Sequence, residues 1–174
     1  MLFTGKGDDG NTNLFGYCDQ RISKSSAIAE ALGAVDEINS LLGVAKMAAG
    51  EKIIGILDQV QHDLFIVQAE LAGAKKEIVR GKIVALENVI QEIEQELPPI
   101  KTFFIAGGTP LAAQLDHARA VARRAERRVV KVSEERKVSL SALSYLNRLS
   151  SLLYVLARLE NHKSGIKEKS PRYD

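Results

Sequence analysis

Cysteine, proline, tryptophan and long apolar runs are scarce in this sequence, and their scarcity excludes several classes of protein. The single cysteine, Cys18, can neither close an internal disulfide nor hold a structural zinc ion by itself, so a reducing cytoplasm is the expected compartment. Residues 1–10 lack the basic and apolar regions of a secretory signal, and no apolar stretch approaches the roughly 20 residues that cross a bilayer. We therefore expect a cytoplasmic protein with no membrane partner.

An excess of charge of one sign is also missing. The sequence holds 24 Lys and Arg against 22 Asp and Glu, so binding of phosphate or nucleic acid would have to be local. Its 174 residues, 45% of them hydrophobic, suit one domain with a sizeable core. Residues 1–97 contain no proline, and residues 111–164 contain neither proline nor glycine, which leaves room for long helices.

Apolar residues recur at steps of three and four in five segments, each with a charged opposite face. This spacing predicts helices over about residues 25–49, 52–74, 82–97, 111–132 and 139–163. We expect a loop-like N-terminal segment at residues 1–24 and a flexible tail at residues 164–174. The predicted fold is all-α, a single domain over residues 1–174 built as a five-helix bundle with ferritin-like up-and-down packing.

Glycine is concentrated near the N-terminus. Residues 4–12 read TGKGDDGNT, and Arg21 and Lys24 follow them. Backbone N–H groups between closely spaced glycines can turn toward one anion, and lysine and hydroxyl side chains add charge and hydrogen bonds, which is phosphate-binding chemistry. The segment lacks the Gly-x-x-x-x-Gly-Lys-Ser/Thr pattern, and no strand is predicted before it. A flexible terminus without a ligand is the other interpretation of these residues.

The segment 111–132 is rich in arginine. Arg119, Arg123 and Arg127 are spaced by four residues and stack along one helical face, opposite an apolar stripe. Guanidinium groups on a rigid face suit a polyphosphate, and Asp36 and Glu37 are candidates to hold an arginine in place. Two other interpretations stay open. One is a solvated charged face; the other is a recognition helix for nucleic acid, against which the apolar stripe and the absence of interleaved aromatic residues count.

Several kinds of catalytic site have no support in the sequence. No Glu-x-x-His occurs, so a di-iron site is not expected. His62, His117 and His162 fall on different predicted helices without metal-ligand spacing, and we expect no metal ligands from the chain. Because no hydrolytic triad has a local signature, any nucleophile is expected to come from a substrate or cofactor.

Four segments, taken together in their order and spacing, are a more specific signal of a protein family than any one of them alone. They are TGKGDDGNT at 4–12, ALGAVDEINS at 31–40, Gly107-Gly108 leading to Ala118-Arg119 and RRAER at 123–127, and NRLS at 147–150. Over about residues 4–158 the chain resembles the PduO-type ATP:cob(I)alamin adenosyltransferases. The resemblance implies a five-helix bundle that assembles as a homotrimer with active sites between subunits.

The activity that the resemblance implies is transfer of the 5′-deoxyadenosyl group of ATP to the cobalt of reduced cobalamin, with release of triphosphate and with Mg²⁺ carried by ATP. It agrees with the missing nucleophile, because Co(I) itself attacks. A reductase or a cobalamin-dependent enzyme is a candidate protein partner, and no nucleic-acid partner is implied. The alternative is a non-catalytic helical nucleotide- or RNA-binding module that uses the arginine-rich fourth helix.

The resemblance also assigns residues on the nucleotide side of the site. The N-terminal segment would wrap the triphosphate through Thr4, Gly5, Gly7, Asp8, Gly10 and Lys24. Arg119 would pair with Asp36 to organise the site. ATP would also be contacted by Arg123, Glu126 and Asn147.

On the corrinoid side, Phe103 takes the position of a family phenylalanine that blocks the lower axial face of cobalt and so makes four-coordinate Co(II) easier to reduce. A plain core aromatic is another interpretation of Phe103, and the adjacent Phe104 is a second candidate for the family position. Residues 98–110 are too apolar for a solvated loop, so we expect core or ligand to cover them. The sequence departs from the family pattern on this side at Ala106, Asp116 and Ser151.

Overall fold

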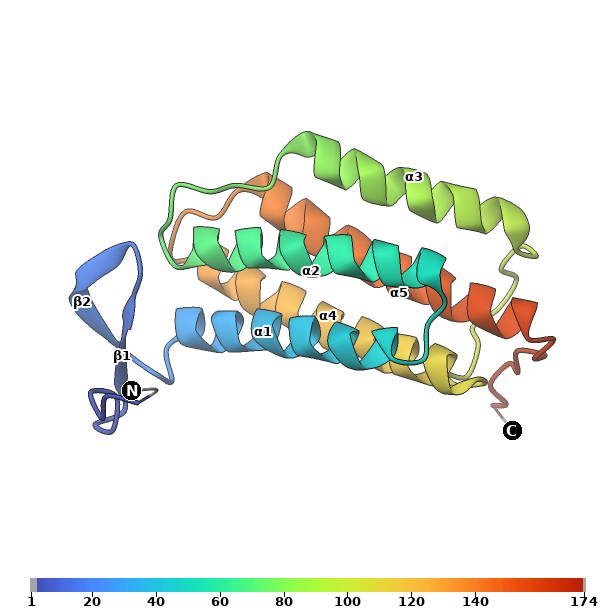
Figure 1. The fold of residues 1–174 in the computed structure, drawn as a ribbon, viewed down its shortest axis with the longest axis horizontal. Coiled ribbons are helices and arrows are strands. Elements are labelled where there is room, and N and C mark those ends of the chain that lie inside the picture. Colours follow the sequence, from blue (N-terminus) through green and yellow to red (C-terminus); the bar gives the residue numbers. More distant parts are fainter. Residues whose placement is uncertain (1–2, 174) are drawn as a thin grey trace.

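Five helices lie along one another in the part of the chain that the structure, a computed structural model, describes (Figure 1). It describes residues 3–173, of which residues 17–20 by their backbone alone, so the side chain of Cys18 lies outside it. The helices are α1 (Ala27–Lys46), α2 (Glu51–Leu71), α3 (Arg80–Glu96), α4 (Pro110–Ser133) and α5 (Leu140–Lys163). Their ends lie within three residues of the predicted ones, and the all-α bundle is confirmed.

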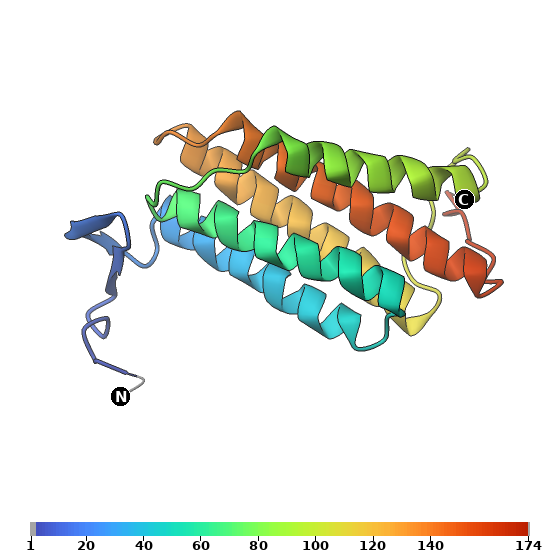
Figure 2. The ribbon, with the colours of Figure 1, turned by 45° about the horizontal axis from the view of Figure 1, so that its top comes forward.

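Helix α4 packs against both α1 and α5, while α3 packs against α5 and α2 against α1 (Figure 2). Helix α5, which lies between α4 and α3, buries leucines on most of its surface: Leu146, Leu149, Leu152, Leu153, Leu156 and Leu159. Both central helices begin at a hydroxyl cap, since Thr109 Oγ1 accepts from the N–H of Ala112 and Ser139 Oγ from that of Ala142, each at 3.0 Å. No helix in the described residues has the length and apolar character of a membrane span.

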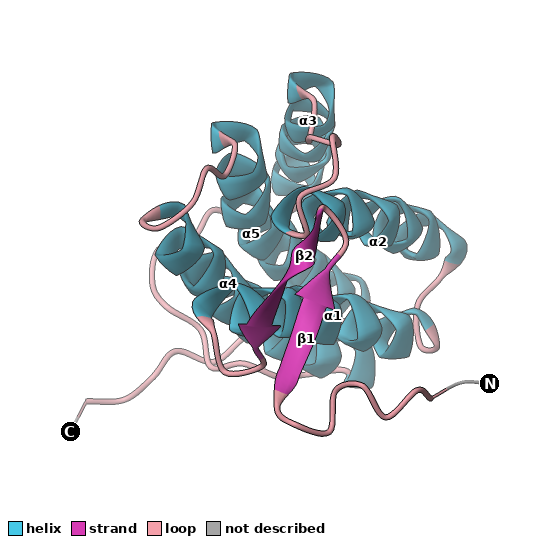
Figure 3. Ribbon diagram, turned by 90° about the vertical axis from the view of Figure 1, so that its left-hand side faces the viewer, coloured by secondary structure: helices cyan, strands magenta, loops and turns pink. Residues whose placement is uncertain are grey.

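The N-terminal segment contains a β-hairpin, so the prediction of a loop is wrong for residues 11–23 (Figure 3). Strands β1 (Asn11–Leu14) and β2 (Tyr17–Ser23) pair antiparallel, with Asn11 opposite Ser23. Gly16, between the strands, donates its N–H to the carbonyl oxygen of Ala72 at 2.7 Å, and a Cβ there would lie 2.2 Å from the carbonyl oxygen of Gly73. Contact with the end of α2 therefore supports the hairpin, and no local periodicity reveals such a contact.

The connector between α3 and α4, residues 97–109, is held by Asn161 of α5. The Asn161 amide donates to the carbonyl oxygen of Gly107 at 2.8 Å and accepts from the N–H of Thr109 at 3.1 Å. Gly107 and Gly108 have φ of +125° and +114°, and a Cβ on Gly108 would lie 2.0 Å from Asn161 Oδ1. Glycine is therefore required at Gly108 both by its backbone conformation and by the approach of Asn161.

The C-terminal tail, residues 164–173, contains no helix or strand and lies against the connector. The N–H of Ile105 donates to the carbonyl oxygen of Lys169 at 2.8 Å, and Glu168 accepts from Arg158 Nε at 3.0 Å. Figure 1 shows the connector and the C-terminus at one end of the bundle and the hairpin at the other. The two ends of the bundle therefore carry different loop segments.

Candidate functional site

A cavity of about 550 Å³ lies where the connector meets α4 and α5. We call it the arginine pocket, and its walls are Ile100, Phe103 and Phe104 of the connector, Arg119 and Arg123 of α4, and Ser150, Ser151 and Tyr154 of α5. Apolar rings beside two guanidinium groups suit a ligand with one flat apolar part and one anionic part. The structure thus brings three predicted site residues together: Phe103, Arg119 and Arg123.

Arg119 is held in place by residues of α4 and α5. Its Nε donates to Asp116 Oδ1 at 3.3 Å, and its guanidinium carbon lies 5.8 Å from the centre of the Tyr154 ring. The other oxygen of Asp116 accepts from the N–H of Gly107 at 3.0 Å, so Asp116 joins the connector to Arg119. Burial raises the pKa of Tyr154, which keeps its ring neutral beside the cation. A departure from the family pattern, Asp116, therefore has a structural role in this chain.

The predicted pair of Arg119 and Asp36 is not formed within one chain. Arg119 takes Asp116 as its partner, while Asp36 Oδ1 accepts from Gln68 Nε2 of α2 at 3.4 Å. Glu37, the other candidate partner from α1, does pair with an arginine of α4, namely Arg124. Whether Asp36 reaches Arg119 of another subunit stays a prediction.

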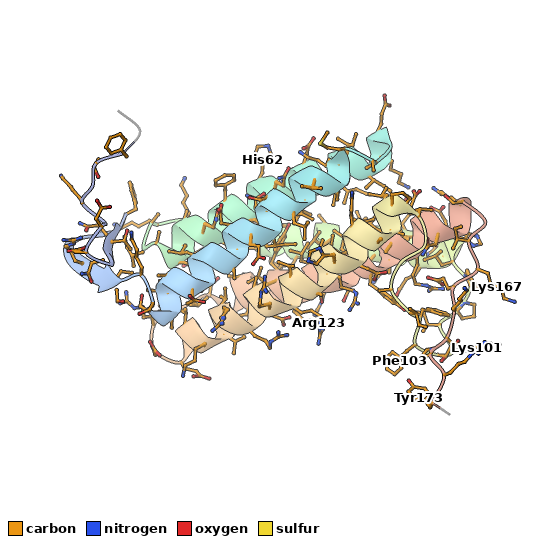
Figure 4. The ribbon with its side chains drawn as sticks, turned by 90° about the horizontal axis from the view of Figure 1, so that it is seen from below. His62, Lys101, Phe103, Arg123, Lys167 and Tyr173 are labelled. Carbon is orange, nitrogen blue, oxygen red and sulfur yellow. The ribbon has the colours of Figure 1, made fainter. Side chains whose placement is uncertain are left out.

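The arginines of α4 divide into two groups. Arg124 pairs with Glu37, and Arg128 lies 3.6 Å from Glu30, so α1 neutralises this part of the helix. Arg123 makes no ion pair or hydrogen bond with any described residue, and it points away from the bundle (Figure 4). The face of α4 that carries Arg124 and Arg128 is therefore neutralised by α1, whereas Arg123 keeps its charge.

Glu126 and Asn147, both assigned to ATP, are brought together by the packing of α4 on α5. Asn147 Nδ2 donates to Glu126 Oε1 at 2.9 Å. Arg148 donates to Asn147 Oδ1 at 2.6 Å and, through Nε, to Glu87 of α3 at 2.9 Å. Asn147 is exposed and Glu126 is half-buried, so the two residues form a polar patch on α4 and α5 outside the arginine pocket.

The N-terminal segment folds around Lys24. Lys24 Nζ donates to the carbonyl oxygen of Gly7 at 2.7 Å, and its backbone N–H donates to that of Gly10 at 2.9 Å. Gly5 and Gly10 have positive φ, and a Cβ on Gly7 would lie 2.9 Å from Lys24 Nζ. Thr4 and Asp8 are exposed in the same loop. The predicted loop residues are therefore neighbours, and the loop has the tight turns that an anion-binding loop needs.

Arg21 of β2, to which the resemblance assigns no role, also contacts this loop. It donates to both oxygens of Asp9 at 2.9 Å and to the carbonyl oxygen of Lys6 at 2.6 Å. The N–H of Asn11 lowers the pKa of Asp9, and the charge of Arg21 acts in the same direction. Only the pairing of β1 with β2 brings Arg21 to Asp9, so spacing along the sequence does not reveal this contact.

Within one chain, the N-terminal loop and Phe103 lie at opposite ends of the bundle (Figure 4). The structure therefore does not bring the predicted triphosphate loop and the predicted corrinoid-side phenylalanine together in one chain. It also leaves the Phe103 ring 80% exposed, so the expectation that protein core covers it is wrong for the single chain. Coverage by a ligand stays a prediction.

No group of three or more His, Cys, Asp or Glu side chains in the described residues could hold a metal ion. The nearby acids Asp116, Glu126 and Glu37 each have a hydrogen-bonding partner of their own.

The fold and the arginine pocket define a helical-bundle protein with a site for an anionic ligand that also has a flat apolar part. The chain belongs to the cobalamin adenosyltransferase family, whose sequence model matches residues 2–160. It is 38% identical to the corrinoid adenosyltransferase PduO of Citrobacter freundii over 169 residues, which is 92% of this chain and 50% of that protein. It is 35% identical to the corrinoid adenosyltransferase of Bacillus subtilis, covering 95% of this chain and 89% of that one.

Solved structures agree with the sequence comparison. A variant of a PduO-type ATP:corrinoid adenosyltransferase from Lactobacillus reuteri, complexed with cobalamin and ATP, superposes with a TM-score of 0.92 at 30% identity, over 99% of this chain and all of that chain. Another variant of the enzyme, complexed with ATP, gives 0.91. The chain spans about half the length of the PduO proteins from Citrobacter and Salmonella that it matches.

Proposed function

We propose that this chain transfers the 5′-deoxyadenosyl group of ATP to the cobalt of reduced cobalamin and releases triphosphate. The observation that carries the proposal is the arginine pocket, where an exposed phenylalanine lines the same cavity as two arginines. Relatives of 30% identity, complexed with cobalamin and ATP, share the fold over almost the whole chain and support this choice of substrates.

In this reaction Co(I) is the nucleophile and attacks C5′ of ATP. The new cobalt–carbon bond forms as the C5′–oxygen bond breaks, and the electron pair of that bond leaves with triphosphate. The chain therefore needs no nucleophile of its own, and its task is to position the substrates and to stabilise charge. Arg123, which has no partner among the described residues, has all its donors free for the developing triphosphate charge.

We assign the triphosphate to the N-terminal loop of Thr4, Gly5, Gly7, Asp8, Gly10 and Lys24, and the rest of ATP to Arg123, Glu126 and Asn147. The separation of this loop from Phe103 within one chain supports active sites shared between subunits of a homotrimer. In such an assembly Asp36 of one subunit would pair with Arg119 of the next. Mg²⁺ would be held by the phosphate oxygens of ATP.

On the corrinoid side, Phe103 would lie under the ring and exclude the lower axial ligand of cobalt. Its exposed side chain supports this assignment because no protein atoms compete for the ring. Reduction of Co(II) would then need an electron donor, so a reductase is the protein partner that the chemistry requires; a cobalamin-dependent enzyme would receive the product. We place both in the cytoplasm, in keeping with the single cysteine.

The decisive test is adenosylation under strictly anaerobic conditions. The chain is incubated with ATP, Mg²⁺ and chemically reduced cobalamin, and the cobalt–carbon product is followed by its light-sensitive spectrum. Arg123→Ala should lower turnover on the order of 10²-fold, since it removes a donor to the leaving group. The matched control is Lys131→Gln, at the far end of α4, where Lys131 pairs with Glu134. No product, together with salt-sensitive RNA binding, would instead support the RNA-binding alternative.

A further inference from the structure

A second cavity, of about 400 Å³, shares Phe104 with the arginine pocket as a common wall. We call it the lysine pocket. The connector and the C-terminal tail supply most of its lining, with Pro98, Pro99 and Phe104 giving an apolar floor and Lys101 and Lys167 giving positive charge. None of these lysines belongs to the ATP site described above. The lysine pocket is therefore a neighbour of the corrinoid side and not a part of the nucleotide side.

The buried cation of this cavity is already neutralised. Arg158 is only 4% exposed; its Nε donates to Glu168 at 3.0 Å and its Nη2 to the carbonyl oxygen of Pro98 at 3.1 Å. Its guanidinium carbon lies 5.2 Å from the centre of the Phe104 ring. These contacts fix the floor of the pocket, and the Arg158–Glu168 pair contributes no net charge to it.

Lys101 and Lys167 supply the uncompensated charge. Both are exposed, and neither forms an ion pair or hydrogen bond with any described residue. Figure 4 shows them at the same end of the bundle as Phe103. A pocket with two free ammonium groups above an apolar floor suits a phosphate diester that carries an aromatic base, because the lysines bind the phosphate and the floor accepts the base.

We propose that the lysine pocket binds the phosphate of the lower nucleotide that is attached to the corrin ring of cobalamin. The inference rests on the proposed function: if Phe103 excludes the lower axial base from cobalt, the base and its phosphate must lie elsewhere, on a tether that begins at the ring. The lysine pocket shares Phe104 with the arginine pocket as a wall, and its positive charge is opposite to that of the phosphate on the tether.

The test compares cobalamin with cobinamide, a corrinoid that has the ring but lacks the phosphate and the lower base. Lys101→Gln and Lys167→Gln should each raise the dissociation constant and the KM for cobalamin about 3- to 10-fold, as expected for the loss of one charged contact. The constants for cobinamide and for ATP should stay at their wild-type values. Lys169→Gln is the matched control, because this lysine lies in the same tail but outside the lysine pocket.

Binding is measured by absorbance titration of the Co(II) corrinoids, so the result does not depend on turnover. Inorganic phosphate should compete with cobalamin and not with cobinamide. Equal competition with both would mean that phosphate acts where the corrin ring binds, and would overturn the proposal. Equal losses for both corrinoids, or no loss for either, would also overturn it. Absence of adenosylated product from the wild-type chain with either corrinoid would contradict the proposed function instead.

Discussion

Phe103 and Phe104 are adjacent in the sequence, but their side chains have different surroundings. Phe103 and Phe104 both line the arginine pocket, but the Phe103 ring is 80% exposed whereas Phe104 is half-buried beneath the guanidinium group of Arg158. Burial and the cation–π contact tie Phe104 to the protein. Phe103 has no such contact, so it is the residue of the two that is available to cover a ligand.

Phe103→Ala should therefore change activity and not stability. We expect its free energy of unfolding to stay within about 0.5 kcal/mol of wild type, as for other exposed side chains. Turnover with pre-reduced Co(I), which has no lower ligand, should be largely kept, while turnover from Co(II) with a reductant should fall steeply. The spectrum of bound Co(II) should lose its four-coordinate component.

Phe104→Ala is the matched control for this pair. It removes a half-buried ring and should cost about 1–3 kcal/mol of stability, measured by urea unfolding. If Phe103→Ala behaved in the same way, with both activities falling in step with stability, Phe103 would be a structural residue and its assignment to the corrinoid would be wrong.

At the scale of the helices, a buried polar network joins α2, α3 and α5. The Asp63 carboxylate is almost inaccessible to solvent; it accepts from the hydroxyl of Tyr145 at 3.0 Å and forms an ion pair with Lys82. Gln59 donates to the same carboxylate at 2.9 Å. Because α3 packs mainly on α5, this network is a buried link between α3 and α2, beside the exposed ion pair of Lys52 with Glu92. Removing one of these three donors would leave the buried Asp63 carboxylate partly unsatisfied and would lower the stability of the folded protein.

Tyr145→Phe should lower the free energy of unfolding by about 1–3 kcal/mol, since it removes one hydrogen bond to a buried charge. Burial raises the pKa of Tyr145 above its ordinary value of 10.0. A raised pKa means that the stabilisation is complete below the unfolded-state value and is lost as the pH rises above it. Urea unfolding should therefore give a constant difference between the two proteins from pH 6 to pH 9, and a smaller one above about pH 10. A difference that shrank already between pH 6 and pH 9 would contradict this assignment.

At the scale of the whole molecule, the N-terminal loop and Phe103 lie at opposite ends of the bundle, and only an assembly of chains would join them in one site. Asp36 and Arg119 illustrate this, because each has another partner within its own chain. If they meet across a subunit interface, a chain defective in one residue can complement a chain defective in the other.

Asp36→Asn and Arg119→Lys should each reduce turnover severely, and the double mutant should be little worse than either, because coupled residues are not additive. Mixed oligomers are made by co-refolding the two single mutants. If the subunits assort at random, about one quarter of the sites should hold both wild-type residues, and activity should return in that proportion. Light scattering should report about three chains per particle in active samples. Mixtures without recovery, or an active monomer, would mean that the site is complete within one chain.

The sequence by itself determined the elements of the bundle. A helix that is buried on one side repeats its apolar residues within the segment, so the five helices could be predicted to within three residues of each end. The four motifs, taken together, also identified the family. Local spacing also predicted some groups of site residues. Gly5, Gly7 and Gly10 are close together along the chain, and Arg119 and Arg123 lie one turn apart on one helix.

Contacts between distant residues were decided only by the tertiary structure. The hairpin needs Gly16 against Gly73, the connector needs Asn161 against Gly107, and the lysine pocket needs the tail to return to Arg158. None of these contacts leaves a periodic signal, because the partners lie on separate elements and are joined by packing. Asp116 shows both cases. Helical spacing places it beside Arg119, but its hydrogen bond with the N–H of Gly107 depends on how the connector folds back.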